Sequence, residues 1–216
     1  MSQLNRLRIT EIFYSLQGES ITSGLPTVFV RLTGCPLRCQ YCDTAYAFHG
    51  GQWLAFDEIL RKVEKYGAIN VCVTGGEPLA QKNCKDLLRL LCAKGYVVSI
   101  ETSGAISIDG IDNRVSCVMD LKTPGSGEVS KNLLSNIELL TDSDQLKFVL
   151  CSREDYEWAK GVLEEYSLIG RLEILFSVSF GQLQPQELAG WILEDGLNVR
   201  FQMQLHKLLW NDEPGH

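Results

Sequence analysis

The feature that most constrains the fold of this chain is the alternation of short apolar segments with amphipathic ones. Segments rich in β-branched residues, such as 27–32 (TVFVRL) and 70–74 (NVCVT), predict buried strands. Segments such as 56–65 and 154–166 have the spacing of amphipathic helices. Strands that alternate with helices of this length form right-handed βαβ units, and these build a parallel sheet.

The predicted elements follow one another without a linker, an internal repeat or a low-complexity tract. We expect strands at 9–15, 27–32, 70–74, 97–101, 117–121, 145–150, 172–177 and 198–203, and helices at 56–65, 83–94, 132–140, 154–166 and 186–194. Six or seven strands are expected in the parallel sheet, and 216 residues fall short of the roughly 250 typical of a closed barrel. The sequence therefore predicts an α/β fold with an incomplete parallel β/α barrel, as one domain over 1–216 with short N- and C-terminal additions.

Charge and hydropathy narrow the class of protein further. The chain has 20 Lys and Arg against 27 Asp and Glu, a net charge of −7, so its surface repels phosphate backbones and no nucleic-acid partner is expected. No stretch approaches 18 consecutive apolar residues, and no apolar segment follows the basic start. We expect neither a membrane span nor a signal peptide, and hence a cytoplasmic protein.

Three of the eight cysteines, Cys35, Cys39 and Cys42, stand together as C-P-L-R-C-Q-Y-C. Zinc normally takes four ligands, and the nearest histidine is His49. A four-iron cubane takes one outer ligand per iron, so three cysteines would leave one iron open to a small molecule. The spacing indicates an iron–sulfur site, with a partial zinc knuckle or core thiols as the alternatives. The other cysteines lie among apolar neighbours and are interpreted as core thiols: Cys72, Cys84, Cys92, Cys117 and Cys151.

Glycine-rich and polar motifs follow the ends of the predicted strands. The cysteine loop follows 27–32, G-G-E-P follows 70–74, E-T-S-G begins at the end of 97–101, and D-L-K ends 117–121. The carboxyl ends of parallel strands meet at one rim of a barrel, where the chemistry of such folds is found. We therefore expect these motifs to lie together.

The combination of a C-x3-C-x2-C loop with G-G-E-P after the next strand resembles the radical S-adenosylmethionine (SAM) superfamily. The full set is similar to the family of 7-carboxy-7-deazaguanine synthases, lyases of queuosine biosynthesis, a tRNA modification pathway. It comprises S-L-Q-G-E at 15–19, Arg31, C-D-T at 42–44, T-G-G-E-P at 74–78, E-T-S-G at 101–104 and Q-L-H-K at 204–207. The resemblance covers nearly the whole chain and is thin between about 171 and 185.

The resemblance implies a [4Fe-4S] cluster on Cys35, Cys39 and Cys42, SAM on its open iron, and Mg²⁺ at Thr44. An electron from the reduced cluster would break a C–S bond of SAM and release a 5′-deoxyadenosyl radical. The implied reaction converts 6-carboxy-5,6,7,8-tetrahydropterin to 7-carboxy-7-deazaguanine, through hydrogen abstraction at C6, ring contraction and loss of ammonia. The resemblance also implies an electron donor such as flavodoxin or ferredoxin, and a homodimer.

The same resemblance assigns two sets of binding residues. Those for SAM are Gly76, Glu101, Ser103, Asp120, Leu121 and Lys122, and those for the substrate are Leu16, Gln17, Gly18, Glu19, Arg31, Thr74 and His206. A pterin ring offers a planar donor–acceptor edge that suits amide, carboxylate and backbone groups, and its carboxylate suits an arginine. Structural alternatives remain at this point: an ion pair for Arg31, a solvated surface for Asp120 and Lys122, and packing for His206.

Three other classes of protein compete with this interpretation. A glycyl-radical activating enzyme would also use SAM, but it would act on a protein partner and would not need the L-Q-G-E segment or Arg31. A ferredoxin-like electron carrier needs a fourth cysteine at cluster spacing, and the sequence has none. The third alternative is a zinc-binding module. Analysis of the purified protein for iron, sulfide and zinc would distinguish it from an iron–sulfur protein.

Overall fold

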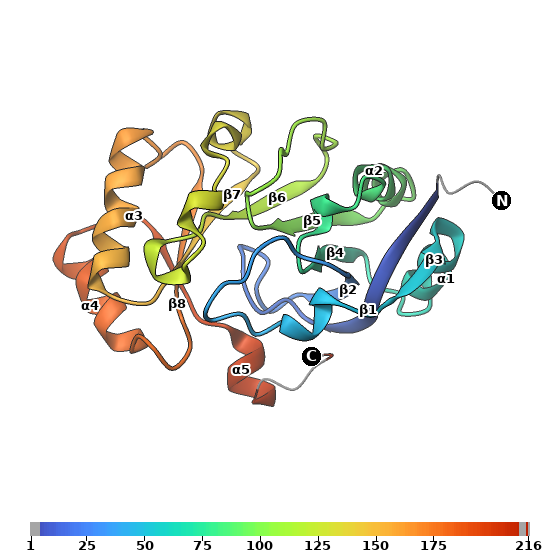
Figure 1. The fold of residues 1–216 in the computed structure, drawn as a ribbon, viewed down its shortest axis with the longest axis horizontal. Coiled ribbons are helices and arrows are strands. Elements are labelled where there is room, and N and C mark those ends of the chain that lie inside the picture. Colours follow the sequence, from blue (N-terminus) through green and yellow to red (C-terminus); the bar gives the residue numbers. More distant parts are fainter. Residues whose placement is uncertain (1–4, 212–214, 216) are drawn as a thin grey trace.

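The computed structural model describes residues 5–211 and 215 of the chain. Its strands are β1 (Arg6–Leu16), β2 (Pro26–Leu32), β3 (Gln52–Ala55), β4 (Asn70–Gly75), β5 (Val97–Thr102), β6 (Ser116–Asp120), β7 (Gln145–Leu150), β8 (Glu173–Val178) and β9 (Arg200–Gln202). Its α-helices are α1 (Phe56–Glu64), α2 (Cys84–Ala93), α3 (Arg153–Glu165), α4 (Pro185–Glu194) and α5 (Leu205–Trp210). In Figure 1, α1 and α2 lie beside one end of the sheet and α3 and α4 beside the other, with α5 set apart from both pairs.

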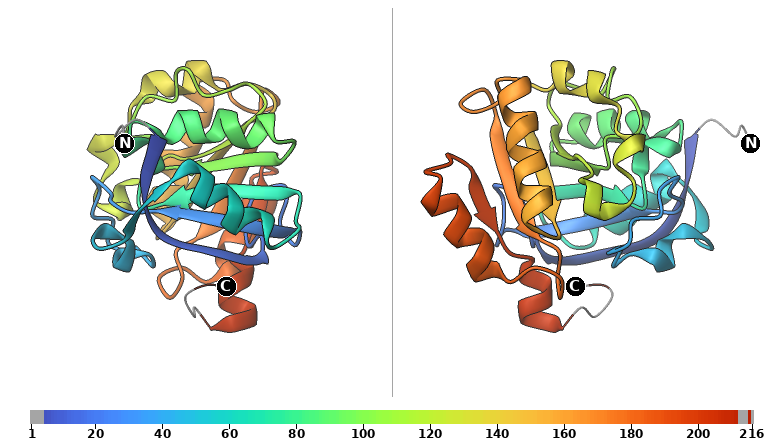
Figure 2. Two further views of the ribbon diagram at one scale, coloured as in Figure 1. Left: turned by 90° about the vertical axis from the view of Figure 1, so that its right-hand side faces the viewer. Right: turned by 60° about the vertical axis from the view of Figure 1, so that its left-hand side comes forward.

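All nine strands belong to one sheet, in the order β3-β1-β2-β4-β5-β6-β7-β8-β9. β1 pairs antiparallel with β2 and β3, whereas β2 and β4 to β9 are parallel neighbours. The parallel part therefore has seven strands, and within the described residues no ladder joins the two outer strands, β3 and β9. The sheet curves without closing (Figure 2), so the expected incomplete parallel barrel is confirmed.

Local signals explain why the main helices begin where they do. The Ser152 side chain accepts a hydrogen bond from the Asp155 backbone N–H and so caps α3. Glu58, in the first turn of α1, accepts from the Ala55 N–H at 2.8 Å. In the described part of the chain, no helix is both long enough and apolar enough to cross a bilayer.

One strand and one α-helix of the described residues were not expected from the sequence. β3 has only four residues and runs directly into α1, so it shows no period of its own. α5 follows the expected last strand and carries Leu205, Leu208 and Leu209 at helical spacing. The helix is short, but it places Q-L-H-K beside the loop after β1, which no strand-based prediction would do.

The expected helix at 132–140 is wrong. Short 3-10 helices occupy Val129–Lys131 and Leu134–Leu139 instead. The reason is a tertiary contact of the buried Asn136 side chain, which donates to the carbonyl groups of Gly104 and Ile106 and accepts from the Ile108 N–H. These three bonds tie the segment to the loop after β5 and override its helical propensity.

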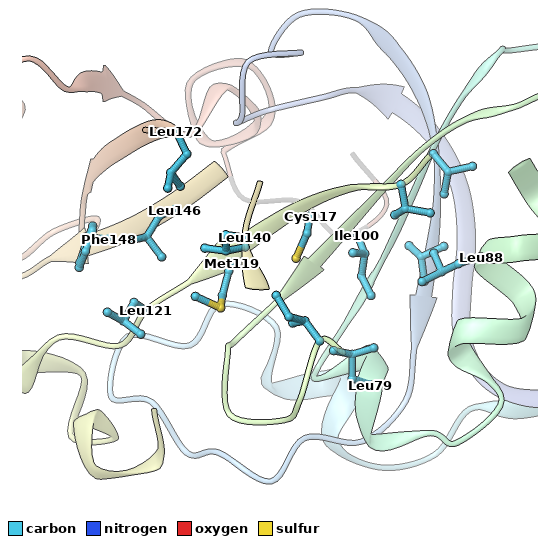
Figure 3. Packing of buried hydrophobic residues seen from close by; sticks show 14 of the residues in the cluster. Leu79, Leu88, Ile100, Cys117, Met119, Leu121, Leu140, Leu146, Phe148 and Leu172 are labelled. Carbon is cyan, nitrogen blue, oxygen red and sulfur yellow. The ribbon is translucent and has the colours of Figure 1, made fainter. Parts of the chain in front are cut away.

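Side chains alternate in direction along the parallel strands, and this alternation separates the core from a central cavity. Leu146 and Phe148 of β7 belong to the hydrophobic cluster that also contains the buried faces of α2, α3 and α4. Figure 3 shows both side chains in that cluster, together with Met119. Lys147 and Val149, the intervening residues of β7, line the cavity on the other face.

The loop between β1 and β2 crosses to the far strands of the sheet. The Ser20 N–H donates to Gln202 Oε1 at 2.9 Å, and Gln202 Nε2 donates back to the Ser20 carbonyl at 2.7 Å. The Ile21 N–H donates to Gln145 Oε1 at 2.9 Å. Gln202 lies on β9 and Gln145 on β7, so this loop bridges the side of the barrel that the strand ladder leaves open.

Candidate active site

One cavity of about 500 Å³ collects almost all residues predicted to carry the chemistry. The cysteine loop contributes Cys35, Cys39, Cys42 and Thr44; β1 and the loop after it contribute Leu16, Gln17, Gly18 and Glu19; the strands and their ends contribute Arg31, Thr74, Gly76, Glu101, Ser103, Asp120 and Lys122; α5 contributes His206. The expectation that the strand-end motifs share one rim is therefore correct. This volume is in the range of small-molecule sites.

Leu121 is the exception. Its side chain is fully buried in the hydrophobic cluster and does not line the cavity. Figure 3 shows it among the core residues. The alternation that turns Asp120 and Lys122 towards the cavity turns Leu121 away from it. The side chain of Leu121 therefore does not reach the cavity, and a SAM contact of this residue would have to come from its backbone.

The fold holds the cysteine loop in shape from several sides. The Glu77 N–H donates to the Gly34 carbonyl at 2.8 Å, which ties the loop to the end of β4. Arg38 donates through Nη1 to the Cys35 carbonyl at 2.8 Å, and its own N–H donates to Glu128 Oε1 at 2.7 Å. A loop anchored in this way needs little reorganisation to hold a cluster.

The three thiols are the donor set that a cubane cluster requires. All three are free and half-buried on the wall of one cavity. Burial raises the pKa of Cys35 and Cys42, and raises the pKa of Cys39 to about 11. Binding of iron would therefore release protons from these groups. Among the described residues, no three His, Cys, Asp or Glu side chains are arranged so that they could hold a single metal ion. A cubane cluster does not need such an arrangement, because each thiolate binds a different iron.

The G-G pair at the end of β4 is required by the cysteine loop itself. A Cβ at Gly76 would stand 2.5 Å from the Gly34 carbonyl oxygen and 2.7 Å from Cys35 Cβ. A Cβ at Gly75 would stand 2.5 Å from the Leu32 carbonyl oxygen. Both glycines let β4 pack directly against the segment that carries the cysteines. The pair thus has a packing role besides the ligand contact expected from the sequence.

Glu77 organises the E-T-S-G segment from beneath. It is fully buried and accepts hydrogen bonds from the Leu79 N–H at 2.9 Å, from Thr102 Oγ1 at 2.9 Å and from the Ser103 N–H at 2.7 Å. The Ser103 hydroxyl also donates to Glu77. Because its proton is used in this way, Ser103 Oγ can only accept a hydrogen bond from a ligand in the cavity.

Glu101 joins two residues that were predicted for the substrate. Its Oε1 accepts from Gln17 Nε2 at 3.3 Å, and its Oε2 accepts from Thr74 Oγ1 at 3.1 Å. The structure therefore brings residues of the β1–β2 loop, β4 and β5 to one point. Glu101, which we assigned to SAM from the sequence, stands in the middle of the substrate group.

Arg31 forms an ion pair and also lines the cavity, so it has the features of both roles that were considered for it. Its Nε donates to Glu11 Oε1 at 2.7 Å, and its guanidinium lies 5.5 Å from the Phe13 ring centre and 5.8 Å from that of Tyr46. Burial alone would lower the pKa of Arg31, but Tyr46 and Glu11 raise it, so the net shift is upward. The ion pair orients the side chain while Arg31 still lines the cavity.

Thr44 precedes a 3-10 helix (Ala45–Phe48) but does not cap it through its side chain. Its Oγ1 donates to Asp43 Oδ1 at 2.8 Å instead, which leaves the lone pairs of the hydroxyl available. Asp43 Oδ2 lies 3.2 Å from Lys207 Nζ on α5. Oxygen atoms of this kind are the ligands that Mg²⁺ prefers.

α5 docks on the loop after β1. The Leu205 N–H donates to the Gly18 carbonyl at 3.2 Å, and a Cβ at Gly18 would stand 2.9 Å from His206 Nδ1. His206 therefore lies on a helix that faces the loop, with the imidazole on the wall of the cavity.

Lys147 is the charged residue that sequence reasoning missed. It lies on β7, a strand in which all six residues are buried, and its Nζ lies 2.6 Å from Glu19 Oε2 and 4.0 Å from Asp120 Oδ2. Lys122 Nζ lies 2.9 Å from the same Asp120 oxygen. A lysine inside a strand whose other residues, apart from Gln145, are apolar was the signal that could have revealed it. Tyr41, Ser179 and Phe180 also line the cavity and were not singled out.

The wall of the cavity has polar atoms that the described part of the chain leaves without a hydrogen-bond partner. They are Glu19 Oε1, Tyr41 Oη, Asp120 Oδ1 and Ser179 Oγ. A buried polar atom without a partner is costly, so these positions call for groups of a bound ligand. Together with three thiols on one loop, they fit an iron–sulfur cluster and polar ligands such as SAM and a pterin.

The fold and this site define a radical SAM enzyme. Residues 29–114 match the Radical SAM superfamily. The chain is 44% identical over 216 residues to the 7-carboxy-7-deazaguanine synthase of Chlorobaculum tepidum, covering 99% of this chain and 98% of that protein. It is 41% identical to the enzyme of the same name from Methanospirillum hungatei, with 96% and 87% covered. The chain belongs to the 7-carboxy-7-deazaguanine synthase family.

A comparison of solved structures agrees on the fold. The crystal structure of QueE from Escherichia coli superposes with a TM-score of 0.74 at 22% identity, covering 92% of this chain and 94% of that one. The family membership does not favour the alternative of a glycyl-radical activating enzyme. The radical SAM superfamily implies a [4Fe-4S] cluster and SAM as cofactors.

Proposed function

We propose that the chain converts 6-carboxy-5,6,7,8-tetrahydropterin to 7-carboxy-7-deazaguanine with loss of ammonia, as a lyase of queuosine biosynthesis. The observation that carries this proposal is the single cavity in which the three-cysteine loop, the strand-end motifs and the loop after β1 meet. When bound, the cluster and SAM supply the one-electron chemistry that starts the ring contraction by removing hydrogen at C6.

Separate residues of the cavity serve the two cofactors. Cys35, Cys39 and Cys42 hold the cluster. Ser103 Oγ accepts from a SAM donor, since Glu77 takes its proton. Other SAM contacts are assigned to Gly76, Glu101, Asp120, Lys122 and the backbone at Leu121. Glu77 fixes the segment from which Ser103 projects, so the geometry for SAM is set before it binds.

The substrate is bound from the loop after β1 and from β2. Gln17, Glu101 and Thr74 are joined by hydrogen bonds and present amide, carboxylate and hydroxyl groups to the donor–acceptor edge of the pterin. The two terminal nitrogens of Arg31 would bind the substrate carboxylate while Glu11 holds its Nε. Leu16, Gly18, Glu19 and His206 complete this side of the pocket.

Mg²⁺ is proposed as a third bound group. Thr44 Oγ1 would be a ligand, with Asp43 orienting the hydroxyl through the 2.8 Å hydrogen bond. A divalent cation at this position would offset the repulsion between the SAM carboxylate and the substrate carboxylate in the cavity. Mg²⁺ suits the role because it keeps some of its waters and prefers oxygen ligands.

The remaining expectations concern the setting of the reaction. We propose that residues 1–216 work as one radical SAM core domain in the cytoplasm, as a homodimer. A flavodoxin or ferredoxin would deliver the electron to the cluster.

Anaerobic incubation tests the proposed reaction. The cluster-loaded protein is incubated with SAM, a chemical reductant and the carboxytetrahydropterin, and the mixture is analysed by mass spectrometry. The proposal predicts the mass of 7-carboxy-7-deazaguanine. Loaded protein that cleaves SAM without giving this product would instead support action on a protein partner.

A further inference from the structure

Lys147 is a buried cation to which the proposed function assigns no role. Its side chain rises from the middle of β7 into the cavity, and the residue is only 9% exposed. Burying an ammonium group is costly unless carboxylates surround it. A lysine at this position therefore needs a reason beyond packing, and its contacts supply one.

The contacts of Lys147 connect two segments that are far apart in the sequence. Its Nζ lies 2.6 Å from Oε2 of Glu19, on the loop after β1, and 4.0 Å from Oδ2 of Asp120, at the end of β6. Burial alone would lower the pKa of Lys147, but Glu19 and Asp120 outweigh this effect and hold it above its usual value. The ammonium is thus charged and shared by two carboxylates.

Each of these carboxylates keeps one oxygen without a partner. Glu19 Oε1 and Asp120 Oδ1 are both buried, and within the described residues neither accepts a hydrogen bond. In each case the other oxygen is the one that faces a lysine. The lysines fix the rotation of the carboxylates, and the two unpartnered oxygens are left as acceptors on the wall of one cavity.

We propose that Lys147 is a positioning residue that orients Glu19 towards the substrate and Asp120 towards SAM, so that a single buried ammonium sets the placement of the two molecules relative to each other. The inference rests on the proposed function, because that function assigns Glu19 to the pterin and Asp120 to SAM. Glu19 Oε1 would take an N–H group of the pterin, and Asp120 Oδ1 would take a hydroxyl or ammonium group of SAM.

Lys122 provides an internal comparison. Its Nζ lies 2.9 Å from Asp120 Oδ2, and the ion pairs of the described residues link it to Asp120 and not to Glu19. Lys122 therefore orients only Asp120, the carboxylate assigned to SAM, whereas Lys147 contacts both Asp120 and Glu19. Loss of each lysine should produce a different pattern of binding defects.

The test measures the dissociation constants of SAM and of the carboxytetrahydropterin separately, by calorimetry on cluster-loaded enzyme without reductant. The variants are Lys147→Met, Lys147→Arg and Lys122→Met, with Lys62→Met on the exposed surface of α1 as the control. Lys147→Met should weaken pterin binding by about tenfold or more, because Glu19 loses its partner. SAM binding should weaken by about threefold, because the 4.0 Å contact is weaker than the 2.6 Å contact.

The other variants complete the pattern. Lys147→Arg should restore part of both affinities because it restores the charge, and Lys122→Met should weaken SAM binding without changing pterin binding. Lys62→Met should change neither. Iron content and thermal midpoint report whether each variant folds. If Lys147→Met does not fold, Glu19→Gln should weaken pterin binding alone.

Two results would overturn the inference and can be told apart. In the first, the wild-type enzyme binds both ligands, and Lys147→Met binds both equally well or has a weaker affinity for only one of them. This result would refute the role of Lys147 and leave the proposed function intact. Wild-type enzyme that binds SAM but not the pterin would refute the proposed function, and the inference with it.

Discussion

Gly18 and His206 face each other so closely that a Cβ on the glycine would stand 2.9 Å from the imidazole Nδ1. The two residues are brought together by α5, whose first N–H donates to the Gly18 carbonyl at 3.2 Å. A glycine in the L-Q-G-E segment is therefore needed for a contact with the C-terminal part of the chain. This contact closes one side of the cavity where the substrate is proposed to bind.

Gly18→Ala should displace His206 and lower kcat/KM by about 10- to 100-fold, since small displacements at a reacting centre have effects of this size. Iron content should stay at the wild-type level because the cysteine loop is not touched. The matched control is Gly161→Ala on α3, where an added Cβ meets nothing within 4 Å. Steady-state kinetics of both variants make the comparison, and equal kinetics for Gly18→Ala and wild type would refute the contact.

Replacing Cys35, Cys39 or Cys42 with Ala should abolish the bound cluster or leave a degraded one, because one iron loses its only protein ligand. Cys72→Ala and Cys117→Ala should keep the full iron content, since both thiols are buried in the core. These two changes should lower the free energy of unfolding by about 1–3 kcal/mol. Iron and sulfide analysis decides the assignment, and loss of iron in Cys72→Ala but not in Cys39→Ala would reverse it.

Arg31→Ala should weaken substrate binding by about 2–5 kcal/mol, as when one partner of a buried charge pair is removed. Arg31→Lys should restore little, because an ammonium cannot bond Glu11 and a carboxylate in the planar geometry of a guanidinium. Cluster content should be normal in both variants. Calorimetric titration with the pterin measures the affinity of each variant. Unchanged affinity in Arg31→Ala would contradict binding of the substrate by Arg31 and leave it only the structural ion pair to Glu11.

Thr44→Val, which is nearly isosteric, should lose most of the stimulation by Mg²⁺ with the cluster intact. The hydroxyl is not used as a helix cap, so its loss should not disturb the loop. The measurement is turnover against Mg²⁺ concentration after thorough chelation of the buffer. Full activity of the wild-type protein in chelated buffer would contradict the proposed cation site.

The sequence predicted the succession of strands and helices along the chain and the rim at which the motifs meet, because both follow from the hydrophobic period and from βαβ handedness. It could not predict the segment 134–139, whose 3-10 conformation depends on Asn136 bonding to a loop some 30 residues away in the chain. Nor could it predict α5, since six residues are too few for a reliable period.

In the candidate site, too, the features that follow from local motifs could be predicted, and those that depend on tertiary contacts could not. Motif spacing was enough to predict that the three cysteines and Glu101 lie together, and they line one cavity. It assigned D-L-K to SAM as a unit, whereas the pleat of the strand turns only the side chains of Asp120 and Lys122 to the cavity. Lys147 was missed because it belongs to no motif, and its importance appears only when Glu19 and Asp120 are seen on either side of it.

The ratio of 7-carboxy-7-deazaguanine to 5′-deoxyadenosine after exhaustive anaerobic turnover tests the central claim most directly. We propose that SAM is regenerated in each cycle, so the account predicts many molecules of product for each 5′-deoxyadenosine released. Accumulation of 5′-deoxyadenosine without the deazapurine, from protein with a full cluster and with the pterin present, would contradict it.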